Sequence, residues 1–107
     1  MNTSGIKIKG VRVLVRPFDV KGTFGDLIQM PDDMKAREEL AATEGILVDV
    51  GQCAWQEEIA AGRGPDAEIG DHVIFARYAG QTREGKDGNK YRIINDEDII
   101  AVMEKTS

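Results

Sequence analysis

The stretch IKIKGVRVLV, residues 6–15, decides the fold class, because its apolar residues recur at every second position. Lysine and arginine alternate with isoleucine and valine, which is the pattern of a strand with one buried face. The alternation changes phase once, at Gly10, and such a change predicts a β-bulge. We therefore expect a first strand that carries a bulge at Gly10 and ends near Pro17.

Strand patterns follow at three later places. GILVDVG (45–51) is short, rich in β-branched residues and bracketed by glycines, so it predicts a second strand. DHVIFARYAG (71–80) predicts a third strand that is buried on both faces for part of its length. In REGKDGNKYRIIN (83–95), a tight turn at 87–88 or 88–89 predicts a hairpin.

The tail DEDIIAVMEK (96–105) fits either a short helix capped by Asp96 or a terminal strand. We expect a turn at 96–98 and then a strand. Two segments, 32–44 and 55–64, carry helix formers and predict short helical turns. They lie in long excursions after the first and second strands. The sum is a small all-β, barrel-like sheet whose excursions are long enough to be functional or disordered.

Composition limits the classes of function. With 107 residues, 41% hydrophobic and 31% charged, the chain has the material for one domain with a core. The net charge of -5 and the lack of a basic cluster oppose nucleic acid as a partner. No apolar run is long enough to cross a membrane. Cys53 is the only cysteine, which excludes an intrachain disulfide and fits a reducing, cytoplasmic compartment.

Catalytic and metal patterns are missing from the sequence. His72 is the only histidine, so no His pair can hold a metal, and we expect a surface or edge side chain. Cys53 has no basic neighbour to activate it and is expected to be buried or idle. The acidic run 96–98 lacks the spacing of a calcium loop. Neither GxGxxG nor GxxxxGK(S/T), the glycine motifs that bind phosphate groups, occurs in the sequence. We expect neither an enzyme nor a metal or cofactor of the chain's own.

The first excursion begins with DVKGTFGDLIQMPDDM (19–34), in which Leu27, Ile28 and Met30 stand among turn residues. Glycine, proline and aspartate break regular structure, so these apolar side chains have no periodic element to pack on. Two interpretations remain open. The loop binds a partner, or it folds back over the barrel.

The order of the segments resembles the small co-chaperonin (GroES) family. GILVDVG, IGDHVIFARYAG and KYRIINDEDIIAVME are similar to family segments that occur in the same order. The similarity runs from about residue 11 to the C-terminus. The first strand matches less well, since Ile8 and Val11 stand where the family usually carries proline and aspartate.

The resemblance implies an irregular GroES-like β-barrel that assembles into a homo-heptamer. Such a ring caps a chaperonin double ring once the chaperonin has bound ATP, and it encloses unfolded client proteins. In the family, the first strand of one subunit meets the last strand of its neighbour. The resemblance therefore predicts an interface formed by Val11, Val13 and Val15 against Ile99, Ile100 and Val102 of the next chain.

The resemblance also assigns both excursions. The first, about 19–44, corresponds to a mobile loop that carries an apolar tripeptide into a groove of the chaperonin. Ile28, Gln29 and Met30 fit that tripeptide because Pro31 follows, and a shift by one gives Leu27, Ile28 and Gln29. The second, about 52–68, occupies the place of a roof hairpin, where Trp55 either packs as core or projects into the cavity.

A first loop of this length is similar to that of virus-encoded members, which would act in the host cytoplasm. Two other classes stay open beside the co-chaperonin. One is a small β-barrel scaffold or binding module that docks its apolar loop on a different partner. The other is a barrel enzyme that depends on His72 or Cys53, which the sequence favours least.

Overall fold

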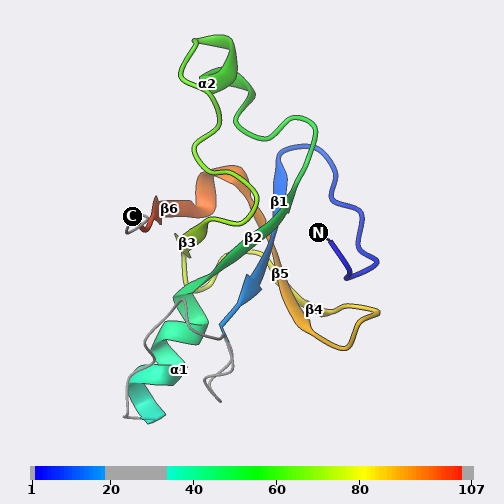
Figure 1. The fold of residues 1–107 in the computed structure, drawn as a ribbon, viewed down its shortest axis with the longest axis vertical. Coiled ribbons are helices and arrows are strands. Elements are labelled where there is room, and N and C mark those ends of the chain that lie inside the picture. Colours follow the sequence, from blue (N-terminus) through cyan, green and yellow to red (C-terminus); the bar gives the residue numbers. More distant parts are fainter. Residues whose placement is uncertain (1, 19–33, 105–107) are drawn as a thin grey trace.

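Six antiparallel strands form a single sheet in the computed structural model, which describes residues 2–18 and 34–104 (Figure 1). The strand order is β4-β5-β1-β2-β3-β6. The strands are β1 Arg12–Pro17, β2 Glu44–Val50, β3 His72–Phe75, β4 Gln81–Glu84, β5 Lys90–Asn95 and β6 Ile99–Val102. The helices within the described ranges are α1 Met34–Thr43, α2 Gln56–Ala60 and a 3-10 turn at Asp96–Asp98.

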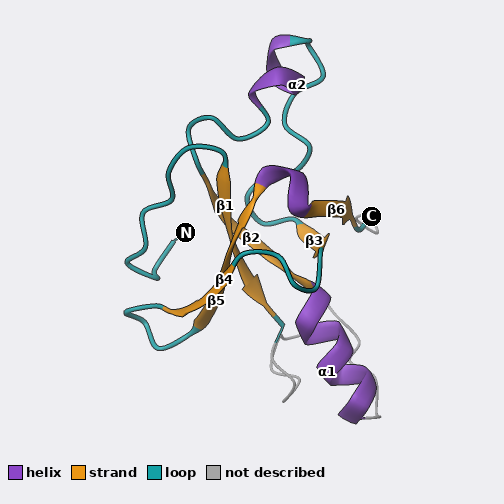
Figure 2. Ribbon diagram, turned by 180° about the vertical axis from the view of Figure 1, so that it is seen from behind, coloured by secondary structure: helices purple, strands orange, loops and turns teal. Residues whose placement is uncertain are grey.

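This architecture confirms the expected all-β, GroES-like fold with two excursions. The first excursion joins β1 to β2 and contains α1, while the second joins β2 to β3 and contains α2. The two views agree that α1 and α2 lie at opposite ends of the molecule, with the sheet between them (Figures 1 and 2). Neither helix of the described ranges combines the length and the apolarity needed to cross a bilayer.

The beginning of the first strand differs from the prediction. β1 starts at Arg12, and the chain turns at Gly10, whose φ is +65°. The Gly10 carbonyl accepts a hydrogen bond from the Cys53 amide at 2.9 Å, so this turn is fixed by the second excursion. The predicted bulge at Gly10 is therefore wrong, and the register shift of β1 against β2 lies between Leu14 and Val15.

The third strand is shorter than predicted. Val73 and Phe75 are fully buried, but His72 and Ile74 are only half-buried. After Phe75 the chain turns away, and the Ala79 amide donates to the Ala76 carbonyl at 3.1 Å. The predicted continuation to residue 80 is therefore wrong.

The hairpin and the tail follow the prediction. β4 and β5 pair in antiparallel register, and Gly88 adopts a φ of +85° in the connecting segment 85–89. Asp96–Asp98 form one 3-10 turn, which Asn95 and Asp98 cap reciprocally. β6 then pairs with β3. The interpretation of the tail as a turn followed by a strand is confirmed.

The core lies on both faces of β1. One buried cluster contains Val13, Val15, Leu47, Ala54, Trp55, Ala67, Val73, Phe75 and Ile94. Leu14 points to the opposite face, where it packs with Ile8 and Tyr91. Each buried valine, leucine, isoleucine or phenylalanine side chain contributes roughly 1.5–3 kcal/mol when it leaves water. β1 is thus buried on both faces by these two clusters, and both of its edges are paired, with β2 and with β5.

Candidate functional site

The residues predicted to bind a chaperonin, Leu27, Ile28, Gln29 and Met30, lie outside the described residues. The structure describes the two ends of the first excursion. It leaves the sheet after Phe18, and it returns through α1, which is followed directly by β2 at Glu44. The predicted binding segment therefore remains a prediction.

The two ends of the first excursion are held together at the sheet. The Phe18 amide donates a hydrogen bond to the Glu44 carbonyl at 3.2 Å. The Phe18 ring is 2% exposed and meets the His72 ring edge-on, with centroids 4.8 Å apart and planes at 71°. His72 Nε2 in turn lies 2.7 Å from Glu44 Oε1. One histidine thus contacts both the departing and the returning chain.

This placement corrects the expectation for His72. Its strand, β3, lies between β2 and β6 rather than at the edge of the sheet. The His72 and Glu44 side chains are 22% and 20% exposed, so the pair is mostly shielded from water. Sequence reasoning missed this contact because the two residues are 28 positions apart.

The predicted interface residues fall into two groups. Val13 and Val15 are 0% exposed inside the chain's own core, and their strand is paired along both edges. Their side chains therefore have no exposed surface in the single chain, and their predicted place at a subunit interface stays a prediction. Val11 and Ile100 are 44% and 67% exposed.

Ile99 and Val102 are half-buried against the main cluster. Their strand, β6, is the last in the strand order and pairs with β3 on one edge. Met103, which the prediction did not include, is 45% exposed just beyond the strand. The continuous apolar run Ile99–Met103, which extends past Val102, carries the signal for it.

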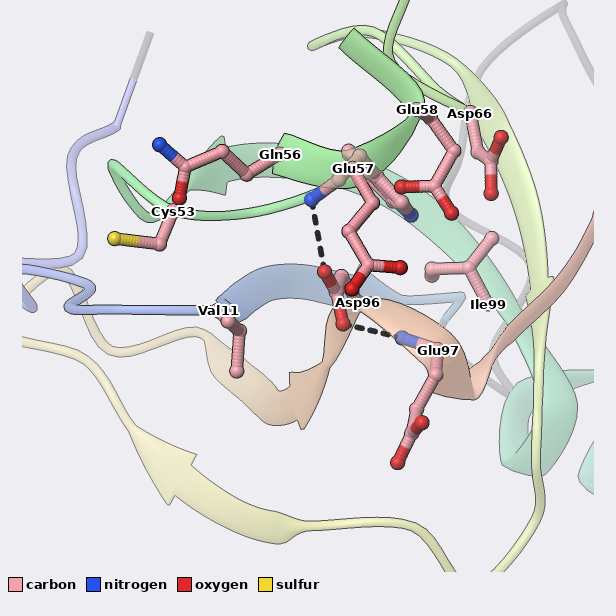
Figure 3. A pocket seen from close by; sticks show the side chains of 10 residues that line it. Val11, Cys53, Gln56, Glu57, Glu58, Asp66, Asp96, Glu97 and Ile99 are labelled. Atoms are coloured by element: carbon pink, nitrogen blue, oxygen red, sulfur yellow. Dashed lines mark hydrogen bonds between the residues drawn. The ribbon is translucent and has the colours of Figure 1, made fainter. Parts of the chain in front are cut away.

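An acidic cleft of about 590 Å³ lies where the second excursion meets the 3-10 turn (Figure 3). Asp96 holds the two parts together, since its carboxylate accepts hydrogen bonds from the amides of Trp55 at 2.8 Å and Glu97 at 2.7 Å. The lining also includes Val11, Cys53, Gln56, Glu57, Glu58, Asp66 and Ile99. Among the described residues, no group of His, Cys, Asp and Glu could hold a metal ion.

Cys53 and Trp55, which both line this cleft, differ in exposure. Cys53 is exposed at the rim of the cleft, so of the two expected alternatives, buried or idle, the first is excluded. Trp55 is 3% exposed and belongs to the main cluster, which confirms that it packs as core rather than projecting outward. Its φ of +54° turns the chain into α2. The Trp55 side chain thus fixes the beginning of the second excursion to the sheet.

A third polar cluster fixes the segment before β1. The carboxylate of Asp87, in the hairpin turn, accepts hydrogen bonds from the Tyr91 hydroxyl and from Thr3 Oγ1, the latter at 2.7 Å. These bonds, that of Tyr91 foremost, hold the pKa of Asp87 well below its ordinary value of 3.8. Burial, together with the bond to Asp87, raises the pKa of Tyr91. The Lys86 amide also donates to the Ser4 carbonyl at 2.6 Å.

Comparison with known proteins gives a consistent result. Residues 6–103 match the family model of the Chaperonin 10 Kd subunit. Co-chaperonin GroES of Geobacillus sp. (strain WCH70) is 30% identical over 102 residues, which cover 92% of this chain and 98% of that protein. Co-chaperonin GroES of Parageobacillus thermoglucosidasius is 32% identical over the same shares. That of Cutibacterium acnes is 35% identical over 95 residues, 88% of this chain and 90% of that protein.

Proposed function

The chain belongs to the Chaperonin 10 Kd subunit family and is a co-chaperonin of a GroEL-type chaperonin, and we propose that seven copies form a ring-shaped lid for it. The observation that carries this function is the match over residues 6–103, which spans every strand and both excursions. The lid would bind the apical domains when the chaperonin holds ATP and would enclose unfolded client proteins.

The proposed contact with the chaperonin is made by Ile28, Gln29 and Met30, with Leu27 as the alternative first position. Burying two or three aliphatic side chains gives roughly 1.5–3 kcal/mol each. Ordering a loop costs about 1–2 kcal/mol of backbone entropy for each residue. One loop therefore binds weakly, but several loops joined in a ring engage at high effective concentration. Such a lid binds firmly and still leaves at each cycle.

The proposed subunit contact uses β6, which is an outer strand of the sheet formed by the described residues. An exposed strand edge invites pairing with another chain, and a closed ring satisfies that edge without further growth. The exposed side chains of Val11 and Ile100 support this surface, and Ile99 and Val102 lie beside it. Val13 and Val15 support it only from behind, as core.

The co-chaperonin family is not a family of enzymes. We propose that this chain needs no cofactor, since ATP is bound by the chaperonin, and that nucleic acid and membranes are not its partners. We place it in the cytoplasm, which would be the host cytoplasm for a virus-encoded member. The acidic lining of the cleft and the net charge of -5 support the exclusion of nucleic acid.

Native mass spectrometry with a bacterial GroEL-type double ring tests the proposal. With ATP, we expect one seven-subunit ring for each bound chaperonin end, and without nucleotide we expect none. Ile28→Ser abolishes binding. Ile59→Ser, which removes an apolar side chain that is 52% exposed on α2, is the matched control and leaves binding intact. Free chain that neither forms a ring nor associates in the presence of ATP contradicts the proposed function.

The same assay decides the register of the binding tripeptide. If Ile28, Gln29 and Met30 enter the groove, Met30→Ser loses binding and Leu27→Ser keeps most of it. The shifted register gives the opposite result.

A further inference from the structure

We propose that His72 is a positioning residue for chaperonin binding, because it ties both ends of the first excursion to β3. This inference rests on the proposed function and deepens it. It starts from three described residues, Phe18, Glu44 and His72, which come from the ends or starts of three neighbouring strands.

The strand register explains why these residues meet. His72 pairs directly with Ile46 across β2 and β3, so their side chains share one face. Glu44 precedes Ile46 by two positions and lies on the same face. Its long side chain therefore reaches diagonally to His72, with 2.7 Å between Oε1 and Nε2. Phe18 approaches from the other side of β2, where its amide bonds the Glu44 carbonyl.

The chemistry of the pair fixes its polarity. A carboxylate oxygen accepts hydrogen bonds, so in this contact Glu44 Oε1 is the acceptor and the N–H at His72 Nε2 is the donor. Hydrogen bonds to a charged partner are about twice as strong as neutral ones, and partial burial lessens the competition from water. The Phe18 ring then packs against the imidazole that this bond orients.

The contact lies at both described ends of the first excursion. No residue intervenes between the last residue of α1, Thr43, and the first residue of β2, Glu44. Fixing the Glu44 side chain therefore fixes the exit of α1. Fixing the Phe18 ring fixes the point at which the chain leaves β1. The His72 carbonyl also accepts from the Met103 amide at 2.8 Å, which connects this point to the end of β6.

Fixed ends lower the entropy that the chain loses when the excursion binds a partner. Loss of the His72 contact should therefore weaken chaperonin binding even when the sheet stays folded. A residue with only a structural role would lower stability without this effect on affinity.

The experiment measures two quantities on the full chain, for wild type, His72→Ala, Glu44→Ala and the double variant. The first is the amide hydrogen exchange of α1 in the free protein. The second is the dissociation constant for a GroEL-type chaperonin with ATP. Each single variant should raise α1 exchange, and weaken binding, by about three- to tenfold. The double variant should be no worse than either, since both remove the same contact.

Thr3→Val is the matched control. It removes the hydrogen bond to Asp87 at the far hairpin, so it disturbs the chain away from the excursion. It should leave α1 exchange and chaperonin affinity unchanged. The emission of Trp55 verifies that each variant is folded, and Glu44→Ala tests the contact from its other side if His72→Ala does not fold.

The outcomes are distinct. Unchanged α1 exchange in both single variants overturns the inference, as does faster exchange with unchanged affinity or an additive double variant. Wild type that fails to bind with ATP overturns the proposed function itself, and with it any role of His72 in that binding.

Discussion

Gly51 lies directly against the carbonyl oxygen of Gly10, and a β-carbon built on Gly51 would come within 2.2 Å of that oxygen. The Gly51 amide donates to the Arg12 carbonyl at 2.8 Å, so β1 and the start of the second excursion are in backbone contact at this point. Only a residue without a side chain fits between them. This contact fixes where β1 begins.

Gly51→Ala should therefore destabilise the protein by about 3 kcal/mol, because the neighbouring atoms are backbone and cannot move aside. The free energy of unfolding in urea measures this cost. Gly88→Ala is the control, since a β-carbon there meets open space and the positive φ alone costs about 1 kcal/mol. Equal costs for the two substitutions would contradict the close approach.

Core and interface can be separated by Val13→Ala and Ile100→Asp. Val13 is fully buried within the chain, so its truncation should lower the free energy of unfolding by about 2 kcal/mol while ring assembly persists. Ile100 is 67% exposed on β6, so a charge there should abolish the ring. Native mass spectrometry and urea unfolding of both variants check this. A ring that survives Ile100→Asp would remove β6 from the interface.

Asp87 predicts a loss of stability in acid. The pKa of a carboxyl group that accepts hydrogen bonds in the folded state is lowered, so its contribution is complete above the ordinary value of 3.8. It is lost progressively as the pH falls below that value. The difference in urea midpoint between wild type and Asp87→Asn should therefore be present at pH 6 and shrink towards pH 2.

Asp66→Asn provides the comparison for Asp87, because Asp66 is an exposed carboxylate of the second excursion. The urea midpoint of Asp66→Asn should equal that of wild type at pH 6 and at pH 2. A gap between wild type and Asp87→Asn that stays constant with pH would mean that Asp87 is not held in its ionised form by Tyr91 and Thr3.

Trp55 anchors the second excursion to the core. Trp55→Ala should cost about 3–5 kcal/mol, because it empties a site in the main cluster. Ile59→Ala, on the exposed face of α2, should change stability by no more than about 0.5 kcal/mol. Thermal unfolding followed by circular dichroism compares the two. A small cost for Trp55→Ala would place the indole outside the core.

The alternation of residues was enough to predict much of the fold. β2, the β4–β5 hairpin and the turn that precedes β6 are coded by short-range signals: apolar period, flanking glycines and a turn-forming aspartate. The helix formers in 32–44 likewise predict a short helical turn, and α1, Met34–Thr43, is the longer helix found there. These features need only neighbouring residues, so the sequence carries them plainly.

Predictions failed where distant segments meet. The change of phase at Gly10 predicted a bulge, but the Gly10 carbonyl accepts a hydrogen bond from the Cys53 amide and the chain turns there instead. β3 ends at Phe75 although the alternation runs further.

By itself, then, the sequence determined the all-β class, the two excursions and the co-chaperonin family, because period and ordered motifs are properties of the chain alone. Only the tertiary structure decided that β1 is an inner strand and that Val13 and Val15 are fully buried in the chain's own core. It also brought Glu44 to His72 across 28 positions. Strand order and register follow from which surfaces can be buried together, and local patterns do not encode that choice.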